Sequence, residues 1–255
     1  MMKKNIVFCV LISTIFCSYA QLTKYYSVTI KKSDENYYGI FRSYSYDLKF
    51  YLCECGNYYI RLDENSTGSM DAHTTLYYIS YGSYKIKNDT LLLTDSYTHH
   101  QMIFKFDDTY AEPVKVFPFM MDYVFTDLGK IQDYYYNWVK CDLFDEFPIP
   151  IEIEKRISDF KKENTQENPL EQGKYFWGPY EIKFTDERYK LSLNLNVPNN
   201  SKLELLFFIG KWEREGNILT LWDTNFEHPF YGLIREDGID LLIFAIYDSL
   251  IFKKE

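Results

Sequence analysis

The feature that most constrains the fold of this 255-residue chain is a pattern that occurs twice, at an offset of 128 residues. Residues 81–95 read YGSYKIKNDTLLLTD, residues 209–223 read IGKWEREGNILTLWD, and the two segments align without a gap. The matched residues are Gly82 with Gly210, Tyr84 with Trp212, Leu91 with Leu219, Leu93 with Leu221, and Asp95 with Asp223. The repeat predicts one β unit that is used twice.

Each copy has the composition of a β-hairpin. The central pairs, Asn88-Asp89 and Gly216-Asn217, both suit a two-residue hairpin loop. With such a loop, Trp212 lies opposite Leu221, and position 84 lies opposite position 93 in the first copy. The same pairing places Gly210 opposite Asp223, where a glycine marks a bend or a close backbone approach. We expect Tyr84 and Trp212 to be core packing residues first and candidate ligand contacts second.

The first 20 residues have the features of a secretory signal peptide. Lys3 and Lys4 form a positive region, residues 6–16 form an apolar core, and Ala20 offers a small residue at the cleavage position. The sequence therefore predicts an exported protein, whether periplasmic, associated with the outer envelope, or extracellular.

The apolar run is too short for a membrane anchor, which needs about 20 residues, and no later run is longer. Cys17 follows Phe16 rather than a small residue, which departs from a lipoprotein box. We expect no transmembrane segment after signal cleavage.

Charge and aromatic content limit the classes of function. The net charge of −9 argues against a nucleic-acid partner, since phosphate binding needs a basic face. Twenty-five tyrosines and twenty phenylalanines favour an aromatic-rich β core. The alternative is a cavity or groove whose rings stack on apolar groups or sugars.

Two segments show the rhythm of short strands separated by turn residues, which is typical of an antiparallel meander in a barrel or sandwich. They are residues 21–128 and residues 173–255. The second holds seven strand candidates, of which the first is residues 174–184. Acidic pairs such as Asp63-Glu64 are expected in turns. The predicted fold class is mainly β, with two antiparallel barrel or sandwich units. The alternative is that the copies are halves of a single larger barrel or sandwich.

Residues 129–172 between these segments predict a short helical linker. Apolar residues follow helical spacing at its start, and later Ile153, Ile157 and Phe160 fall on one helix face. We expect one or two helices that pack on a β domain as an intramolecular clasp. A partner-binding helix is the alternative.

Four sequence elements carry a family resemblance. They are Gly178-Pro179-Tyr180, residues 189–193, Gly210-Lys211-Trp212 and residues 218–221. A G-x-W strand followed by an L-x-L strand resembles the small exported lipocalin-like β domains of bacteria. The resemblance covers residues 174–255 best and residues 36–126 more weakly. It implies a β-barrel that takes part in envelope sensing or binds a small apolar ligand.

Three cysteines remain after signal cleavage, Cys53, Cys55 and Cys141, which is an odd number for an oxidising compartment. Cysteines two apart in a strand share a face, so together with the third they could bind a soft metal such as Cu(I). A disulfide from Cys141 to either partner and simple burial of the thiols are the alternatives. The Cys-x-Cys spacing departs from the Cys-x-x-Cys of copper-linked envelope members of the resembled family, and no cofactor is predicted.

Two histidines are the remaining site candidates. His100 and His228 occupy equivalent positions just after the repeated hairpin. They could act as ligands or bases, although histidines in such loops also form purely local hydrogen bonds.

No G-x-S-x-G, H-E-x-x-H or phosphate-binding glycine loop is present. The sequence therefore favours a non-catalytic, exported cell-envelope binding or interaction protein of lipocalin-like type. Its partner would be a small apolar ligand or an envelope protein, and the sequence does not specify an oligomeric state. The alternative is a secreted hydrolase that acts on carbohydrate or envelope polymers through two carboxylates about 5–10 Å apart.

Overall fold

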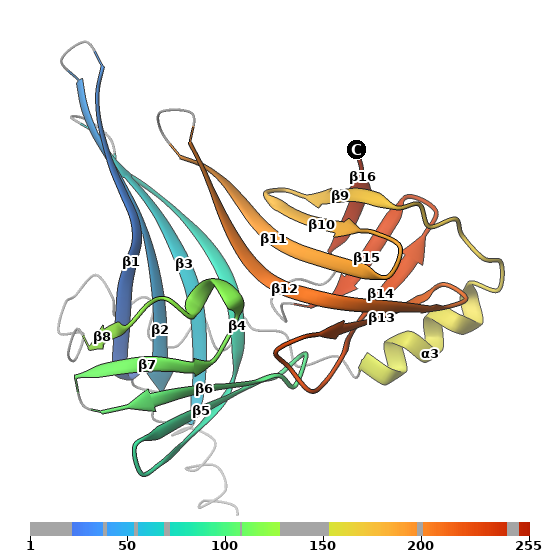
Figure 1. Cartoon of the computed structure of the whole chain (residues 1–255), viewed down its shortest axis with the longest axis horizontal. Coiled ribbons are helices and arrows are strands. Elements are labelled where there is room, and N and C mark those ends of the chain that lie inside the picture. The colour runs from blue at the N-terminus through green and yellow to red at the C-terminus, as the bar shows by residue number, and fades with distance from the viewer. Residues whose placement is uncertain are drawn as a thin grey trace, which may run out of the picture.

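A computed structural model describes residues 22–37, 40–53, 56–68, 72–107, 109–127, 153–197, 201–243 and 250–255. In this part the chain forms two closed antiparallel β-barrels of eight strands each (Figure 1). The predicted mainly β fold with two antiparallel units is confirmed. The alternative of one larger barrel shared between the copies is wrong.

Barrel 1 is an up-and-down meander in which each strand pairs with the next, and β1 pairs with β8 through Tyr26 and Asp127. Its elements are β1 (Leu22–Tyr37), β2 (Ile40–Cys53), β3 (Asn57–Thr67), β4 (Ala72–Lys87), β5 (Thr90–Asp95), β6 (Gln101–Phe106), β7 (Tyr110–Lys115), the 3-10 turn η1 (Pro118–Met120) and β8 (Phe125–Asp127).

Barrel 2 repeats this order and closes through β16 and β9. Its strands are β9 (Gly173–Trp177), β10 (Tyr180–Phe184), β11 (Arg188–Val197), β12 (Ser201–Glu215), β13 (Ile218–Asp223), β14 (Phe230–Arg235), β15 (Gly238–Leu242) and β16 (Ile251–Lys254). The prediction of a single strand over residues 174–184 is wrong. Gly178 takes a positive φ of 54°, and the resulting turn splits the segment into the hairpin of β9 and β10.

The repeated hairpin has the predicted register in both barrels. Gly82 pairs with Asp95 in β4–β5, and Gly210 pairs with Asp223 in β12–β13. A Cβ atom added at Gly82 or Gly210 would overlap a carbonyl oxygen of the neighbouring strand, so glycine is required at both positions. The close backbone approach predicted from the sequence is therefore present.

A β-bulge also recurs in the two barrels. In β4 the pairing with β3 skips Ile79, and in β12 the pairing with β11 skips Phe207. These residues are 128 positions apart and both are buried. A bulge at the same place in both copies extends the repeated unit from a hairpin to three strands.

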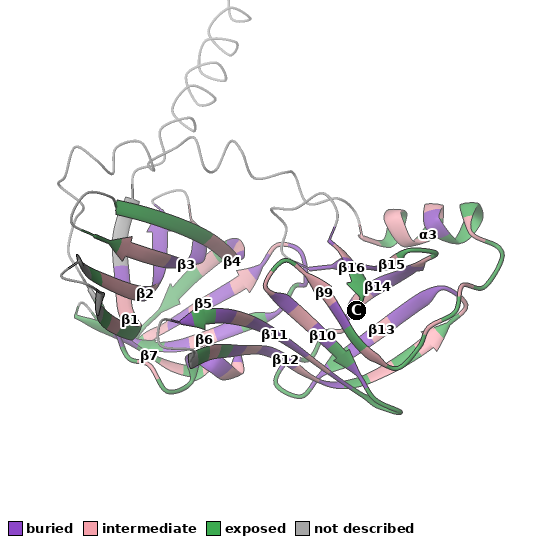
Figure 2. Cartoon of the chain, turned by 90° about the horizontal axis from the view of Figure 1, so that it is seen from above, coloured by how far each residue is buried: buried purple, intermediate pink, exposed green. Residues whose placement is uncertain are grey.

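Side chains fill the interiors of both barrels. In barrel 1 the ring of Phe50 lies 4.6 Å from Tyr26, 5.4 Å from Phe104 and 5.1 Å from Phe125, measured between centroids. In barrel 2 the inward residues of β10, β11 and β13 are almost completely buried. Figure 2 shows buried positions along strands of both barrels. The aromatic residues thus form packed cores.

The one helix of the described residues, α3 (Ile153–Glu163), covers the outside of barrel 2. Phe160 is buried and packs with the partly buried Ile153 and Ile157. Their partners in this cluster are Tyr97, Ile218, Tyr231, Leu233 and Leu242. This helix packs as the predicted intramolecular clasp, and the helical spacing predicted at the start of the linker lies outside the described residues. Among the described residues, no helix combines the length and apolar character that crossing a bilayer requires.

Candidate binding site between the two barrels

The last residue of each repeated hairpin is an aspartate that shapes the loop after it. Asp95 Oδ1 accepts hydrogen bonds from the backbone N–H groups of Tyr97 (2.9 Å) and Thr98 (2.8 Å). Asp223 Oδ1 accepts one from the N–H of Asn225 (2.7 Å). Such bonds fix a turn. The repeat therefore positions two equivalent loops, and these loops meet between the barrels.

The junction between the barrels is aromatic. Phe117, which precedes η1 in barrel 1, lies 5.6 Å from Phe207, 5.3 Å from Phe208 and 5.6 Å from Phe226 of barrel 2. Phe119 lies 4.9 Å from Phe207. Burial of several rings at one contact is strongly stabilising. The two cores are therefore continuous across the junction.

One equivalent position differs between the copies in a way that creates this junction. In barrel 1 the Ser80 hydroxyl lies 2.8 Å from the hydroxyl of Tyr58 and donates to Asp95 Oδ2 at 2.6 Å. The residue 128 positions later is Phe208, which packs on Phe117 and on the ring of His100. A polar residue inside one barrel thus corresponds to an interface residue in the other.

His100 is buried at the same junction, with 1% of its surface exposed. Its ring stacks on Phe226, with 4.5 Å between centroids and an interplanar angle of 4°. Its Nε2 lies 2.7 Å from the backbone carbonyl oxygen of His228. Because a carbonyl only accepts, Nε2 carries a proton and donates it. The structure thus brings the two predicted histidines together, but through the backbone of His228.

We expect His100 to make the protein less stable in acid. Burial lowers the pKa of His100 from 6.5 to about 4. The unfolded chain therefore binds this proton more readily, so stability is complete above about pH 6.5 and is lost as the pH falls towards 4. The loss attributable to His100 is about 3 kcal/mol. Urea unfolding of the wild type and of His100→Phe at several pH values between 6.5 and 4 measures this loss of stability.

The exposed His73 provides the control for this experiment. His73→Phe should keep the full loss of stability in acid, while His100→Phe should lose most of it. Equal acid sensitivity of the His100→Phe variant and the wild type would contradict the assignment.

A cleft of about 740 Å³ opens beside His99 and His228. Its walls are residues 96–99 of the first loop, 153–155 at the start of α3, and 228–231 after the second loop. Tyr231 is a partly exposed ring in this lining, whereas Tyr97 and Phe230 are almost completely buried, and the exposed His99 and His228 supply polar groups. Small-molecule sites often occupy clefts of this size at domain junctions.

Arg156 of α3 joins the elements around this cleft. It donates to the Tyr97 hydroxyl at 3.2 Å and to Asp240 Oδ2 at 2.8 Å. Asp240 is fully buried and also accepts from Arg235 at 2.9 Å. A buried carboxylate held by two guanidinium groups is tightly fixed. The helix therefore connects the loop of barrel 1 to the wall of barrel 2.

Tyr84 and Trp212, the other predicted ligand contacts, lie at equivalent ends of the two barrels. The Tyr84 hydroxyl donates to the Cys53 carbonyl at 2.8 Å, and Trp212 Nε1 donates to the Thr185 carbonyl at 2.9 Å. Each is half-buried against its core, and neither is among the residues that line the cleft. Their contacts are those of packing residues.

The predicted metal candidates lie only partly in the described chain. Cys53 is buried at the end of β2, whereas Cys55 and Cys141 lie outside the described residues. Within the described ranges, no three His, Cys, Asp or Glu side chains are grouped closely enough to bind a metal ion.

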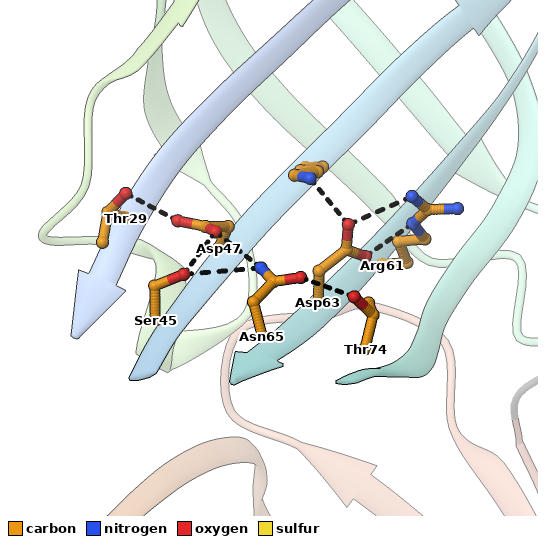
Figure 3. Close-up of polar contacts among 8 residues, drawn as sticks. Thr29, Ser45, Asp47, Arg61, Asp63, Asn65 and Thr74 are labelled. Atoms are coloured by element: carbon orange, nitrogen blue, oxygen red, sulfur yellow. Dashed lines mark hydrogen bonds and ion pairs between the residues drawn. The ribbon is translucent and has the colours of Figure 1, made fainter. Parts of the chain in front are cut away.

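The expectation that Asp63-Glu64 forms a turn is wrong, because both residues lie inside β3. Asp63 is buried on the strand face opposite the core, where it pairs with Lys49 at 2.7 Å and with Arg61 at 2.6 and 3.0 Å (Figure 3). These two cations compensate its charge within the strand pair.

Asp47 is the cross-strand neighbour of Asp63. It accepts hydrogen bonds from Thr29 (2.6 Å), Ser45 (2.9 Å) and Asn65 (2.9 Å), as Figure 3 shows. Both carboxylates are thus engaged in structural contacts.

Comparison with known proteins gives no match to a family model, to a curated protein or to a solved structure. The fold itself therefore defines the class, an antiparallel two-barrel β protein with an aromatic junction. The pair of barrels is consistent with the resemblance to lipocalin-like domains in two copies.

Proposed function

We propose that this chain is an exported, non-catalytic cell-envelope binding protein of lipocalin-like type that holds a small, partly apolar ligand between its two barrels. The observation that carries the proposal is the cleft between the barrels, whose walls come from residues 96–99 of barrel 1, residues 228–231 of barrel 2 and the start of α3. A duplicated unit gains a new concave surface where its copies meet, and such junctions are preferred ligand sites.

Packing supports this location over the lumen of either barrel. The rings of Tyr26, Phe50 and Phe104 occupy the centre of barrel 1. In the cleft, by contrast, the partly exposed Tyr231 lies beside open volume. An amphipathic ligand would stack on the Tyr231 ring and direct its polar group towards His99 or His228.

Export is proposed from the N-terminal sequence, with its two lysines, its short apolar run and Ala20. The hydrolase alternative has less support at this site. Among the described residues that line the cleft, Glu154 is the one acidic side chain, and a glycosidase requires two.

Native mass spectrometry of the protein purified from its own host tests the proposal. We expect a retained small molecule, and we expect Tyr231→Ala to bind it at least about tenfold more weakly, because a stacking ring is lost. Tyr110→Ala removes a tyrosine exposed on barrel 1, away from the cleft, and should bind normally. Equal binding by both variants, or no retained molecule, would refute the proposal.

A further inference from the structure

Strand β4 extends beyond barrel 1 and leaves a sheet edge there. It pairs with β3 from Ala72 to Ser83, but with β5 only from Gly82 to Lys87. Residues 72–76 therefore have no paired strand on their outer side within the described ranges. All five are exposed. Figure 1 shows β4 running well past β5 alongside β3.

This projecting part of the sheet carries side-chain hydrogen bonds on both faces. On one face Thr74 donates to Asn65 at 3.0 Å, and Asn65 donates to Asp47 at 2.9 Å (Figure 3). On the other face Glu64 accepts from the hydroxyls of Tyr46 at 3.1 Å and Tyr77 at 2.9 Å. Side-chain ladders across both faces hold the strands in register. The edge is thus preorganised for pairing.

The opposite edge of the same sheet is protected. Strand β1 pairs with β8 only at Tyr26 and Ser27, and beyond them it carries the exposed residues Lys31, Lys32 and Asp34. Charges on an edge strand oppose pairing with another chain. Residues 72–83 of β4 contain no Lys, Arg, Asp or Glu. The two edges of the sheet therefore differ in charge: β1 carries charged side chains that oppose strand addition, and residues 72–83 of β4 carry none.

We propose that residues 72–76 of β4 pair in antiparallel fashion with the same segment of a second copy of this chain. Antiparallel pairing of a strand with itself gives a twofold dimer and one continuous sheet across it. Thr74 and Thr75 at the centre favour extended structure and cross-strand pairing. Each chain carries a net charge of −9, so an uncharged edge is where two copies meet without opposing like charges.

The interface is small, because about five residues of each chain pair. Interfaces of this size give weak and reversible association. Sedimentation velocity of the mature chain, from about 1 to about 200 µM, should therefore show a monomer at the low end and a growing dimer fraction above it.

The double variant Thr75→Lys/Leu76→Lys places a lysine on each face of the edge and should stay monomeric throughout this range. The matched control is Met121→Lys/Thr126→Lys, which adds the same charge at exposed positions elsewhere on barrel 1 and should dimerise normally. Circular dichroism melting of both variants confirms that they are folded.

Hydrogen exchange locates the contact independently of the variants. The backbone amides of residues 72–76 should gain protection as the wild-type protein is concentrated. Three results would each overturn the proposal. The wild type could remain a monomer at 200 µM, the double lysine variant could still dimerise, or a dimer could form without a change in hydrogen exchange at residues 72–76. Protection that arises only when an envelope extract is added would assign the edge to another protein instead.

Discussion

Replacement of Gly210 by valine should lower the free energy of unfolding by at least about 4 kcal/mol and leave little folded protein. A Cβ at this position overlaps the carbonyl oxygen of Trp222 on the paired strand. That atom belongs to the backbone, so relief requires the separation of β12 from β13 rather than a side-chain rotation. Urea unfolding followed by tryptophan fluorescence measures the effect.

Gly216 in the same hairpin provides the control. It has a φ of 59° and no neighbouring atom within 4 Å of an added Cβ. Asparagine tolerates this left-handed conformation, so Gly216→Asn should cost less than about 1 kcal/mol. Wild-type stability in the Gly210→Val protein would mean that the two strands are not held as closely as the pairing indicates.

Phe117→Ala should have a second large effect, a loss of about 4 kcal/mol that is concentrated at the junction of the barrels. Phe117 is 3% exposed and contacts Phe207, Phe208 and Phe226 of barrel 2. Because it joins two cores that are each closed on themselves, we expect the single unfolding transition of the wild type to split into two. Differential scanning calorimetry shows whether the variant unfolds in one transition or in two.

Met121→Ala is the matched control, since Met121 lies in the same segment but is 46% exposed. It should change stability by less than about 0.5 kcal/mol and keep one transition. If Phe117→Ala shows a single transition with only a slightly lower midpoint, the barrels still unfold together, and their coupling does not depend on Phe117.

The hairpin register could be predicted because its determinants are local. The turn pairs, the period-two alternation, and the positions of Gly210 and Trp212 all act within 15 residues. The recurrent bulges at Ile79 and Phe207 could not be predicted. A bulge depends on which residue of another strand is opposite, and β3 has little sequence likeness to β11.

The candidate site was only partly accessible from the sequence. The offset of 128 indicated His100 and His228, and the repeated aspartates indicated ordered loops after each hairpin. The role of Tyr231 and the link from Arg156 to Tyr97 depend on how the barrels and α3 dock. Docking arises from contacts between residues far apart in the chain, which no local pattern records. The burial of Asp63 inside a strand was missed for the same reason, since its charge is balanced by Lys49 on β2.

The difference between Ser80 and Phe208 means that the two barrels cannot be exchanged. Two barrels of the first type in tandem would place a hydroxyl at the junction where Phe208 now packs on Phe117. Two of the second type would lose the bond from Ser80 to Asp95 inside the first barrel. Each copy is therefore specialised for its place in the chain. The barrels dock in one orientation, in which the first contributes Phe117 and His100 and the second provides the surface on which they pack.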